Sequence, residues 1–313
     1  MAFFEKITNI FCNLFLFFSA LSLSCEKFEK GDIMKFFEKI LKIFDTQMQR
    51  PEAWGWFHLL FWVLILAFAV LLCIFAGREK PERVRKAVLI VAVIVSVLEI
   101  YKQINFSFSY VDGISFDYQW YAFPFQFCST PMYVGLLAGM IKKGRVHDAL
   151  CAYLATYAMF AGLCVMVYPN DIYTETIGIN IQTSVCHGTM ISIAVYLLYS
   201  GHVKLQHKTI LKAMPVFACA MGLAMIMNEI AYRSGLEEAF NMFYISPHQT
   251  PHLPVYSQIQ EIVPFPFCTV IYFISFTLAA YLILLAAMGI SYCYRRIFGK
   301  REAAVNQEAA KIQ

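Results

Sequence analysis

Residues 57–77 read FHLLFWVLILAFAVLLCIFAG, an apolar stretch that contains no Asp, Glu, Lys or Arg. A helix needs about 20 apolar residues to cross a hydrocarbon core about 30 Å thick. Similar stretches follow along the chain at 87–107, 123–141, 149–168, 178–200, 209–231 and 264–292. The sequence therefore predicts an all-α, polytopic integral membrane bundle with about seven transmembrane helices.

The overall composition supports a membrane protein. Hydrophobic residues make up 59% of the chain and charged residues only 15%, whereas a soluble domain carries about 25% charged residues. The mean hydropathy is +0.59. The net charge of +4 is modest and no dense basic block is present, so nucleic acid is not an expected partner. Membrane lipids are the expected partners.

The cysteines do not form a recognisable framework. The chain has ten, and no two of them are spaced as CxxC. Most lie inside the apolar stretches, where a free cysteine behaves as a small hydrophobic residue. We therefore expect neither a disulfide scaffold nor a zinc site, and we predict no metal and no cofactor.

Basic residues indicate the orientation of the bundle. They occur in every second connection, at 78–86, 142–145, 204–208 and 295–301. The alternate connections, 108–122, 169–177 and 232–263, contain a single basic residue, Arg233. Because cytoplasmic loops are enriched in Lys and Arg, we expect the C-terminus to be cytoplasmic and the first span to begin outside.

The N-terminal region precedes the bundle. Residues 10–24 form an apolar run that is short for a span and typical of a signal-peptide core. FFEKITNIF at 3–11 is nearly repeated as FFEKILKIF at 36–44, just after Met34. This indicates either a duplicated segment or a translation start at Met34. Residues 34–44 have their apolar side chains at helical spacing, which predicts an interfacial amphipathic helix.

We divide the chain into three segments on this basis. Residues 1–54 are the N-terminal segment, residues 55–293 the membrane domain, and residues 294–313 a cytoplasmic tail. We expect the chain to reside in a plasma membrane, with a bacterial membrane as the default because no eukaryotic sorting signal is evident.

Polar residues within the spans fall into one layer. Ionisable side chains inside a membrane are costly and usually face the protein interior. In the expected topology, nearly all of the polar residues within the spans lie in the outer halves of five spans. They are His58, Glu99, Lys102, Gln126, Cys128, Ser129, Thr130, Gln182, Ser184, His187, Asn228 and Glu229. Their predicted depth is about 5–13 Å below the outer surface at 1.5 Å per residue. This layering predicts a shared polar cavity that opens outward.

Each of these residues also has a plain structural explanation. His187 and Asn228 could join neighbouring helices through hydrogen bonds, and His58 could be an interfacial residue. Glu99 and Lys102 are spaced to pair with each other. Cys128 could be a small packing residue, and we assign Cys186 to packing because it faces another side of the helix from His187.

A cysteine with a neighbouring histidine can perform acyl transfer. Cys128 and His187 lie on different predicted helices, so their sequence spacing does not establish contact. Gln126, Gln182 and Asn228 are candidates to donate hydrogen bonds to a developing oxyanion. Such a pair in the outer leaflet would meet lipid acyl esters directly.

Several motifs together resemble a known family. They are FPFQFCSTPMYVGLLAGMI at 123–141, TSVCHGTMISIAVYLL at 183–198, MNEIAYRSG at 227–235 and NMFYISPHQTPHLP at 241–254. Their order resembles the YwaF family of integral membrane proteins and the related eukaryotic transmembrane protein 164. The resemblance covers residues 55–292, which is essentially the whole predicted bundle.

The resemblance implies a chemistry and a set of residues. The eukaryotic member is described as a cysteine-dependent phospholipid acyltransferase, distantly similar to membrane hydrolases that use a threonine nucleophile. The family cysteine falls on Cys128 and the family histidine on His187. Asn228, His58 and the Asn241–Tyr244 stretch match further family elements. Together with the polar layer, these imply catalytic Cys128 and His187, and a substrate site that includes Gln126, Gln182, Asn228, His58, Glu99 and Asn241.

The connection at 245–263 departs from an ordinary loop. It is rich in proline and histidine, which predicts an ordered cover over the cavity. His248 and His252 are a weak pair of metal ligands, because prolines lie between and beside them. We therefore keep the prediction that no metal is bound.

Three functions remain open at this point. The first is a membrane acyltransferase or lipid hydrolase with Cys128 as nucleophile and His187 as base. The second is a transporter or channel for a small solute; it lacks the internal repeat and midplane site typical of transporters. The third is a non-catalytic scaffold for another membrane protein. The oligomeric state is left open by the sequence.

Overall fold

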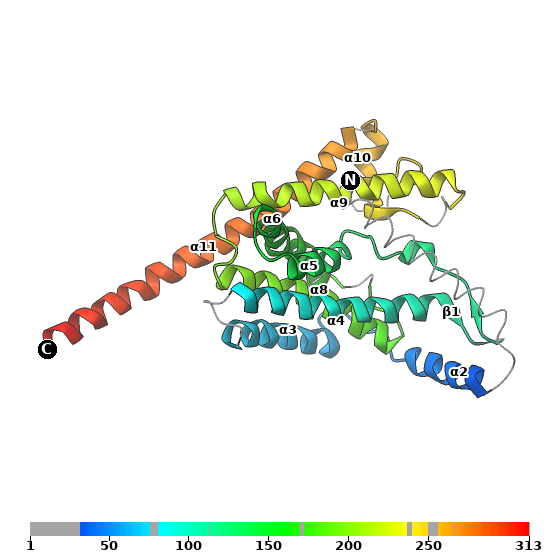
Figure 1. The fold of residues 1–313 in the computed structure, drawn as a ribbon, viewed down its shortest axis with the longest axis horizontal. Helices are drawn as coiled ribbons and strands as arrows, with labels where there is room; N and C mark the ends of the chain where they lie inside the picture. The colour runs from blue at the N-terminus through cyan, green and yellow to red at the C-terminus, as the bar shows by residue number, and fades with distance from the viewer. Residues whose placement is uncertain are drawn as a thin grey trace.

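The computed structural model describes residues 32–75, 81–111, 113–169, 172–236, 240–249, 256–265 and 267–312. Within these ranges the chain is mostly helical (Figure 1). The α-helices are α2 (Asp32–Phe44), α3 (Trp56–Phe75), α4 (Pro81–Ser107), α5 (Thr130–Met140), α6 (Arg145–Tyr153), α7 (Met159–Val167), α8 (Ile177–Tyr199), α9 (Lys208–Arg233), α10 (Tyr256–Ile262) and α11 (Phe267–Ile312). The short elements are β1 (Phe108–Ser109), β2 (Ser115–Phe116), η1 (Trp120–Ala122), η2 (Leu154–Ala158) and η3 (Met242–Tyr244). β1 and β2 form an antiparallel pair that places Phe108 opposite Phe116.

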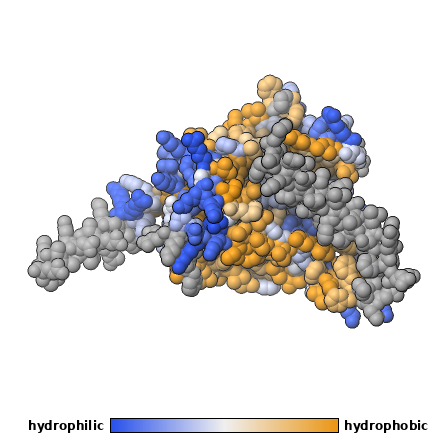
Figure 2. Space-filling model, viewed as in Figure 1, coloured by the Kyte–Doolittle hydropathy of each residue, from blue (hydrophilic) through white to orange (hydrophobic). Residues whose placement is uncertain are grey.

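Six helical segments of the described chain are long and apolar enough to cross a membrane. They are Trp56–Ile74, Pro81–Ser107, Arg145–Val167, Ile177–Tyr199, Lys208–Arg233 and Phe267–Ile297. Large apolar side chains on their outward faces are exposed, among them Val63, Ile94 and Ile274. Figure 2 shows this apolar surface over the bundle, with hydrophilic side chains gathered beside the base of the projecting part of α11. The predicted all-α membrane fold is confirmed.

The third predicted span, 123–141, differs from the expectation. Its helix α5 has only 11 residues, so in the described chain six helices rather than seven are long enough to span. The segment nevertheless runs along most of α4, because Gln103 donates to the Ala122 carbonyl at 2.8 Å and Arg85 donates to the Gly139 carbonyl at 2.9 Å. Gln103 and Arg85 lie about 27 Å apart along α4 at 1.5 Å per residue. The segment 123–141 therefore crosses almost the full thickness of the helical bundle, and its first half is not helical.

Proline explains where this helix begins. Pro124 lacks an N–H group and disfavours a helical conformation at the residue before it. Phe125 and Ser129 instead form tight backbone turns to Phe123 and Gln126. Pro131 lies in the first turn of α5, where its missing N–H is not needed. Irregular backbone at membrane depth is tolerated only where it is buried in protein or lines a cavity, so residues 123–129 mark the place to look for function.

The basic connections meet at one end of the bundle, which we call the basic end. Asp148 at the start of α6 pairs with Lys212 at the start of α9, 3.3 Å apart, and His147 contacts His202 in the α8–α9 connection. The other end, which we call the opposite end, brings together β1, β2, η1 and η3. This arrangement follows the up-and-down order predicted from the charge pattern.

One membrane span is interrupted by a π-helical turn. α6, η2 and α7 run on continuously from Arg145 to Val167, and η2 between them is π-helical. Tyr153 and Tyr157 at this turn are fully buried. The Tyr157 ring stacks on Phe217 of α9 with centroids 4.6 Å apart, and its hydroxyl lies 2.7 Å from that of Thr277 in α11. π-turns within α-helices are frequent at functional sites.

The amphipathic helix predicted at 34–44 is confirmed as α2, which packs on the opposite end of α4. Leu41 is buried, the Phe44 ring lies edge-on to Tyr101 with centroids 4.9 Å apart, and Tyr101 donates to the Phe44 carbonyl at 2.7 Å. The apolar run at 10–24 and the repeat at 3–11 lie outside the described residues.

Candidate active site

A short loop after α9 is held in place by three amide side chains. Asn228 of α9 donates to the Met242 carbonyl at 3.0 Å and accepts from the Met242 N–H at 2.7 Å. Gln126 donates to the Asn241 carbonyl at 2.9 Å and accepts from the Phe243 N–H at 2.8 Å. Asn241 itself accepts from the Ser246 N–H at 3.0 Å. The loop is thus joined to both α9 and the irregular segment before α5.

The loop needs this support because its backbone is strained and buried. Phe243 and Tyr244 have φ angles of 59° and 56°, a conformation that is costly for non-glycine residues. Met242 and Phe243 are fully buried, so their backbone groups must find partners inside the protein. Gln126 and Asn228 supply those partners, and their amide groups position this loop.

A second polar group surrounds Glu99 on α4. Its carboxylate pairs with Lys102 at 2.7 Å and accepts from Gln103 at 2.8 Å and from Gln182 of α8 at 3.4 Å. Tyr118 in turn donates to the Gln103 side chain at 2.8 Å. Burial, followed by the nearby Glu99 charge, raises the pKa of Tyr118, which keeps its phenol protonated. Glu99 is therefore a buried carboxylate whose charge is balanced by Lys102.

His187 of α8 lies close to this group and has one free ring nitrogen. Its Nδ1 lies 2.8 Å from the Thr183 carbonyl, which can only accept a hydrogen bond, so Nδ1 carries the proton. In the neutral ring Nε2 then has a lone pair, and this buried atom has no hydrogen-bond partner among the residues that the structure describes. The charge of Lys102 acts on the His187 ring. The orientation of His187 is thus set by its own helix, while its basic nitrogen remains available.

Cys128 lies just before α5, in the irregular segment. Its side chain is half-buried and lies within electrostatic range of Lys102 and Glu99. Among the described residues no hydrogen bond joins Cys128 to His187, because His187 Nε2 has no partner. The two side chains therefore share Lys102 as a neighbour and do not form a bonded pair in this structure.

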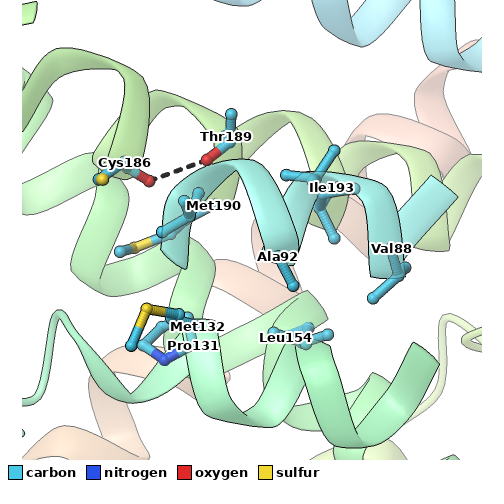
Figure 3. A pocket seen from close by; sticks show the side chains of 12 residues that line it. Val88, Ala92, Pro131, Met132, Leu154, Cys186, Thr189, Met190 and Ile193 are labelled. Atoms are coloured by element: carbon cyan, nitrogen blue, oxygen red, sulfur yellow. Dashed lines mark hydrogen bonds between the residues drawn. The ribbon is translucent and has the colours of Figure 1, made fainter. Parts of the chain in front are cut away.

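Two apolar cavities flank the part of α8 that carries His187. The first lies between α4, α5 and α8, and its lining includes Pro131, Met132, Cys186 and Thr189 (Figure 3). The second has a volume of about 240 Å³ and lies between α3, α4 and α8. Ligand pockets typically measure about 300–1,000 Å³, so the second cavity approaches that range. Thr189 lines both cavities. Val185, one helical turn before Thr189, lines the second cavity.

A family model described as the TMEM164 family matches residues 51–288. The chain belongs to the TMEM164 family. No curated protein and no solved structure matches it. The match supports the resemblance to transmembrane protein 164 and leaves the relation to YwaF a prediction. The matched region includes all the residues of the polar groups described above from Glu99 to Ser246.

His58 has a different environment from the rest of the predicted site in this TMEM164 family member. It is fully buried, and Nδ1 accepts from the Trp54 N–H at 2.9 Å. Nε2 must then carry the proton, which it donates to the Met166 carbonyl at 2.7 Å. Because both ring nitrogens are bound by backbone groups, His58 joins the start of α3 to the end of α7 and has no free polar atom for a substrate.

The predicted polar layer is thus divided into separate groups. Glu99, Lys102 and Gln182 form one hydrogen-bonded group, and Gln126, Asn228 and Asn241 form another, with His187 and Cys128 near the first. Three further members bond elsewhere: Ser184 with the Asn180 carbonyl, Thr130 with Tyr153 and Glu229 with Arg233 and His248. His252, the other half of the weak metal pair, lies outside the described residues.

Sequence reasoning missed two members of the site. Gln103 lies one turn after Glu99, on the same face of α4, and this spacing was a usable signal. Cys186 was assigned to packing, yet Gln182 donates to its sulfur at 3.4 Å and it lines the first cavity. Only the arrangement of α4, α5 and α8 around the first cavity reveals its position.

Proposed function

We propose that this TMEM164 family member is a membrane-embedded cysteine acyltransferase or hydrolase that acts on phospholipid acyl esters in the plasma membrane. One observation carries the proposal. His187 Nε2 is a buried acceptor that has no partner within the described part of the chain, and its ring is held by Thr183 at 2.8 Å in the tautomer that a general base requires. Buried polar atoms are rarely left unpaired without a reason, and proton transfer is the reason favoured here.

The proposed reaction has two steps, with Cys128 as nucleophile. In the first, His187 Nε2 takes the thiol proton, the sulfur attacks the ester carbonyl carbon, and the carbon–oxygen bond breaks. The protonated ring then gives its proton to the leaving lysophospholipid alkoxide. In the second, an acceptor hydroxyl or water gives its proton to His187 and attacks the thioester, which restores the thiol. Closer approach of the two side chains in the substrate complex is part of the proposal, since catalytic contacts are often loose without substrate.

The second cavity supports a lipid substrate. Its lining is apolar, and Leu64 and Ile94 at its edge are about half exposed, at 49% and 48%. Both side chains face outward from the bundle, where the hydrocarbon of a membrane would lie. An acyl chain entering between α3 and α4 would therefore reach the stretch of α8 from Val185 to Thr189, which contains His187.

Asn241 is the proposed oxyanion donor. Its Oδ1 binds the Ser246 N–H, while its buried Nδ2 has no hydrogen-bond partner in the ranges that the structure describes. Gln126 and Asn228, by contrast, use their amide groups on the loop that carries Asn241. We therefore assign Gln126 and Asn228 to positioning, and Asn241 to stabilising negative charge on the ester oxygen.

The proposal is tested by intact-protein mass spectrometry. Purified full-length protein is incubated with phospholipid as wild type, Cys128→Ala, Cys186→Ala and Cys164→Ala. Cys186 is the competing buried thiol near the site, and Cys164 is an exposed cysteine of α7 that reports non-specific acylation. We expect a fatty-acyl mass that hydroxylamine removes, in every protein except Cys128→Ala.

The other outcomes separate the alternatives. An adduct that is lost only in Cys186→Ala would assign the nucleophile to Cys186. No adduct in any protein, with several phospholipids, would contradict the acyl-enzyme mechanism and favour a transporter or a scaffold. A solute-flux measurement on Cys128→Ala would then distinguish those two, because only a transporter would move solute.

A further inference from the structure

Three metal-ligating side chains converge at the basic end, far from the candidate active site. His147 and Cys151 lie one turn apart on α6, and His202 lies in the connection between α8 and α9. His147 Nε2 is 2.8 Å from His202 Nε2 and 3.6 Å from Cys151 Sγ. All three ligand atoms lie within 4.8 Å of one another. Two separate segments of the chain thus bring three donors to one point.

Two of the three donors are buried, and the His147 ring is oriented as metal-bound histidines usually are. His147 and Cys151 are 3% and 2% exposed. His147 Nδ1 donates to the Ala138 carbonyl of α5 at 3.1 Å, so the Nε2 lone pair faces the other two ligands. Such a bond from the second ring nitrogen to a carbonyl is the common support of a metal-bound histidine.

We propose that His147, Cys151 and His202 form a Zn²⁺ site. Zn²⁺ binds imidazole nitrogen at about 2.0–2.1 Å and thiolate sulfur at about 2.3 Å in tetrahedral geometry. A tetrahedral site then places nitrogen and sulfur about 3.6 Å apart and two nitrogens about 3.4 Å apart. The observed sulfur–nitrogen distance already fits. The two imidazoles need to separate by roughly 0.6 Å to meet these values, replacing a direct His–His hydrogen bond.

The charges around the site fit a cation of this kind. Zn²⁺ displaces one proton from the Cys151 thiol, and the proton of His202 moves from Nε2 to Nδ1. Zn²⁺ bound to one thiolate and two neutral imidazoles has a net charge of +1. The negative carboxylate of Asp148 lies within electrostatic range of both Cys151 and His202. The Asp148 side chain is about half exposed, at 54%, and pairs with Lys212. The described residues at this point supply three ligands, and a water molecule would complete the tetrahedral coordination.

The site is independent of the proposed acyl transfer. Ala138, which supports His147, and Thr130, which contacts Tyr153 near Cys128, lie about 12 Å apart along α5 at 1.5 Å per residue. We assign the metal a structural role, in which it ties the start of α6 to the α8–α9 connection. The expectation of no metal rested on the absence of CxxC, which does not exclude ligands from segments 55 residues apart.

The test uses full-length purified protein stripped of metal with a chelator. Zn²⁺ affinity is measured by competition with a chromophoric chelator, and Co²⁺ is used as an optical probe of tetrahedral thiolate binding. The variants are Cys151→Ser, His202→Gln and, as a matched control, Cys164→Ser at an exposed cysteine of the same span. Circular dichroism and gel filtration check that each variant folds.

We expect wild type and Cys164→Ser to bind one Zn²⁺ per chain, with a thiolate-to-cobalt charge-transfer band and a thermal midpoint that rises with Zn²⁺. Cys151→Ser should lose the band, and both it and His202→Gln should bind Zn²⁺ at least about 100-fold more weakly. Equal affinity in all four proteins, an octahedral Co²⁺ spectrum, or no binding by folded wild type would overturn the proposal. None of these outcomes depends on acyl transfer.

Discussion

His58 and His187 are both buried, and both lie where the sequence predicts the polar layer, yet they differ in how their ring nitrogens are used. His58 binds a backbone N–H on one side and a backbone carbonyl on the other. His187 binds one carbonyl of its own helix, and its Nε2 meets no partner among the described residues. Both are buried histidines, and the use of the second ring nitrogen distinguishes them.

The comparison separates structural from chemical roles inside a membrane protein. A buried histidine whose two nitrogens are both bound contributes to stability, because each backbone group it binds would otherwise be unsatisfied. A buried histidine with a free basic nitrogen has a proton-accepting capacity that the fold does not use. Substitutions at the two positions should therefore affect different measurements.

The largest effect is expected for His187→Asn. The asparagine amide can still donate to the Thr183 carbonyl, but it removes the basic Nε2 atom. The rate of thioester formation should fall by about 10²–10⁴-fold, the usual contribution of a general base. Stopped incubations followed by intact-protein mass spectrometry measure this rate, and the thermal midpoint should change little. An unchanged rate would assign the free nitrogen no catalytic role.

His58→Leu should give the reverse pattern. It leaves the Trp54 N–H without its partner and removes one of the two donors to the Met166 carbonyl, the other being Trp62. We expect a loss of about 2–3 kcal/mol of folding free energy, measured by unfolding in detergent. Activity per folded molecule should stay near wild type, and His58→Gln should recover part of the stability. Loss of activity without loss of stability would place His58 in the substrate site after all.

Gly162→Ala should disturb the packing that both histidines share. Gly162 of α7 lies one turn before Met166, and an added Cβ would lie 2.6 Å from the His187 carbonyl. Forcing α7 away from α8 should cost about 1–3 kcal/mol. Gly222→Ala is the matched control, because no atom lies within 4 Å of its added Cβ. That variant should be neutral or slightly more stable, since alanine favours helix by about 1 kcal/mol over glycine. Equal midpoints for the two variants would contradict the close α7–α8 contact.

The smallest expected effect concerns α2, which packs outside the region of the two histidines. Tyr110 donates to Asp45 at 2.9 Å, and this hydrogen bond raises the pKa of Tyr110 above its ordinary value of 10.0. The folded chain thus holds the phenol proton more tightly than the unfolded chain. The contribution to stability is fully present below pH 10 and is lost as the pH rises further. Hydrogen exchange of α2, measured relative to the intrinsic base-catalysed rate at each pH, should lose protection there in wild type, and Tyr110→Phe should show no such step.

Several features of this protein follow from the sequence alone. Apolar runs of about 20 residues predict spans because backbone polar groups cannot remain unpaired in hydrocarbon. The alternation of basic connections predicts the up-and-down order, and the spacing in residues 34–44 predicts α2. The Glu99–Lys102 pair follows from its spacing on one helix face. Each of these features depends on the spacing of residues within one helix or on the number of basic residues in one short connection.

Other features depend on contacts between segments far apart in the chain. The stretch 123–141 has the composition of a membrane helix, but Pro124 and the bonds from Gln126 to the 241–243 backbone favour an irregular first half. Whether a buried histidine is structural or free depends on which carbonyl of another helix it meets. The grouping of His147, Cys151 and His202 requires α6 to pack beside the α8–α9 connection. Sequence determines which groups need partners, and only the tertiary structure decides which of them find one.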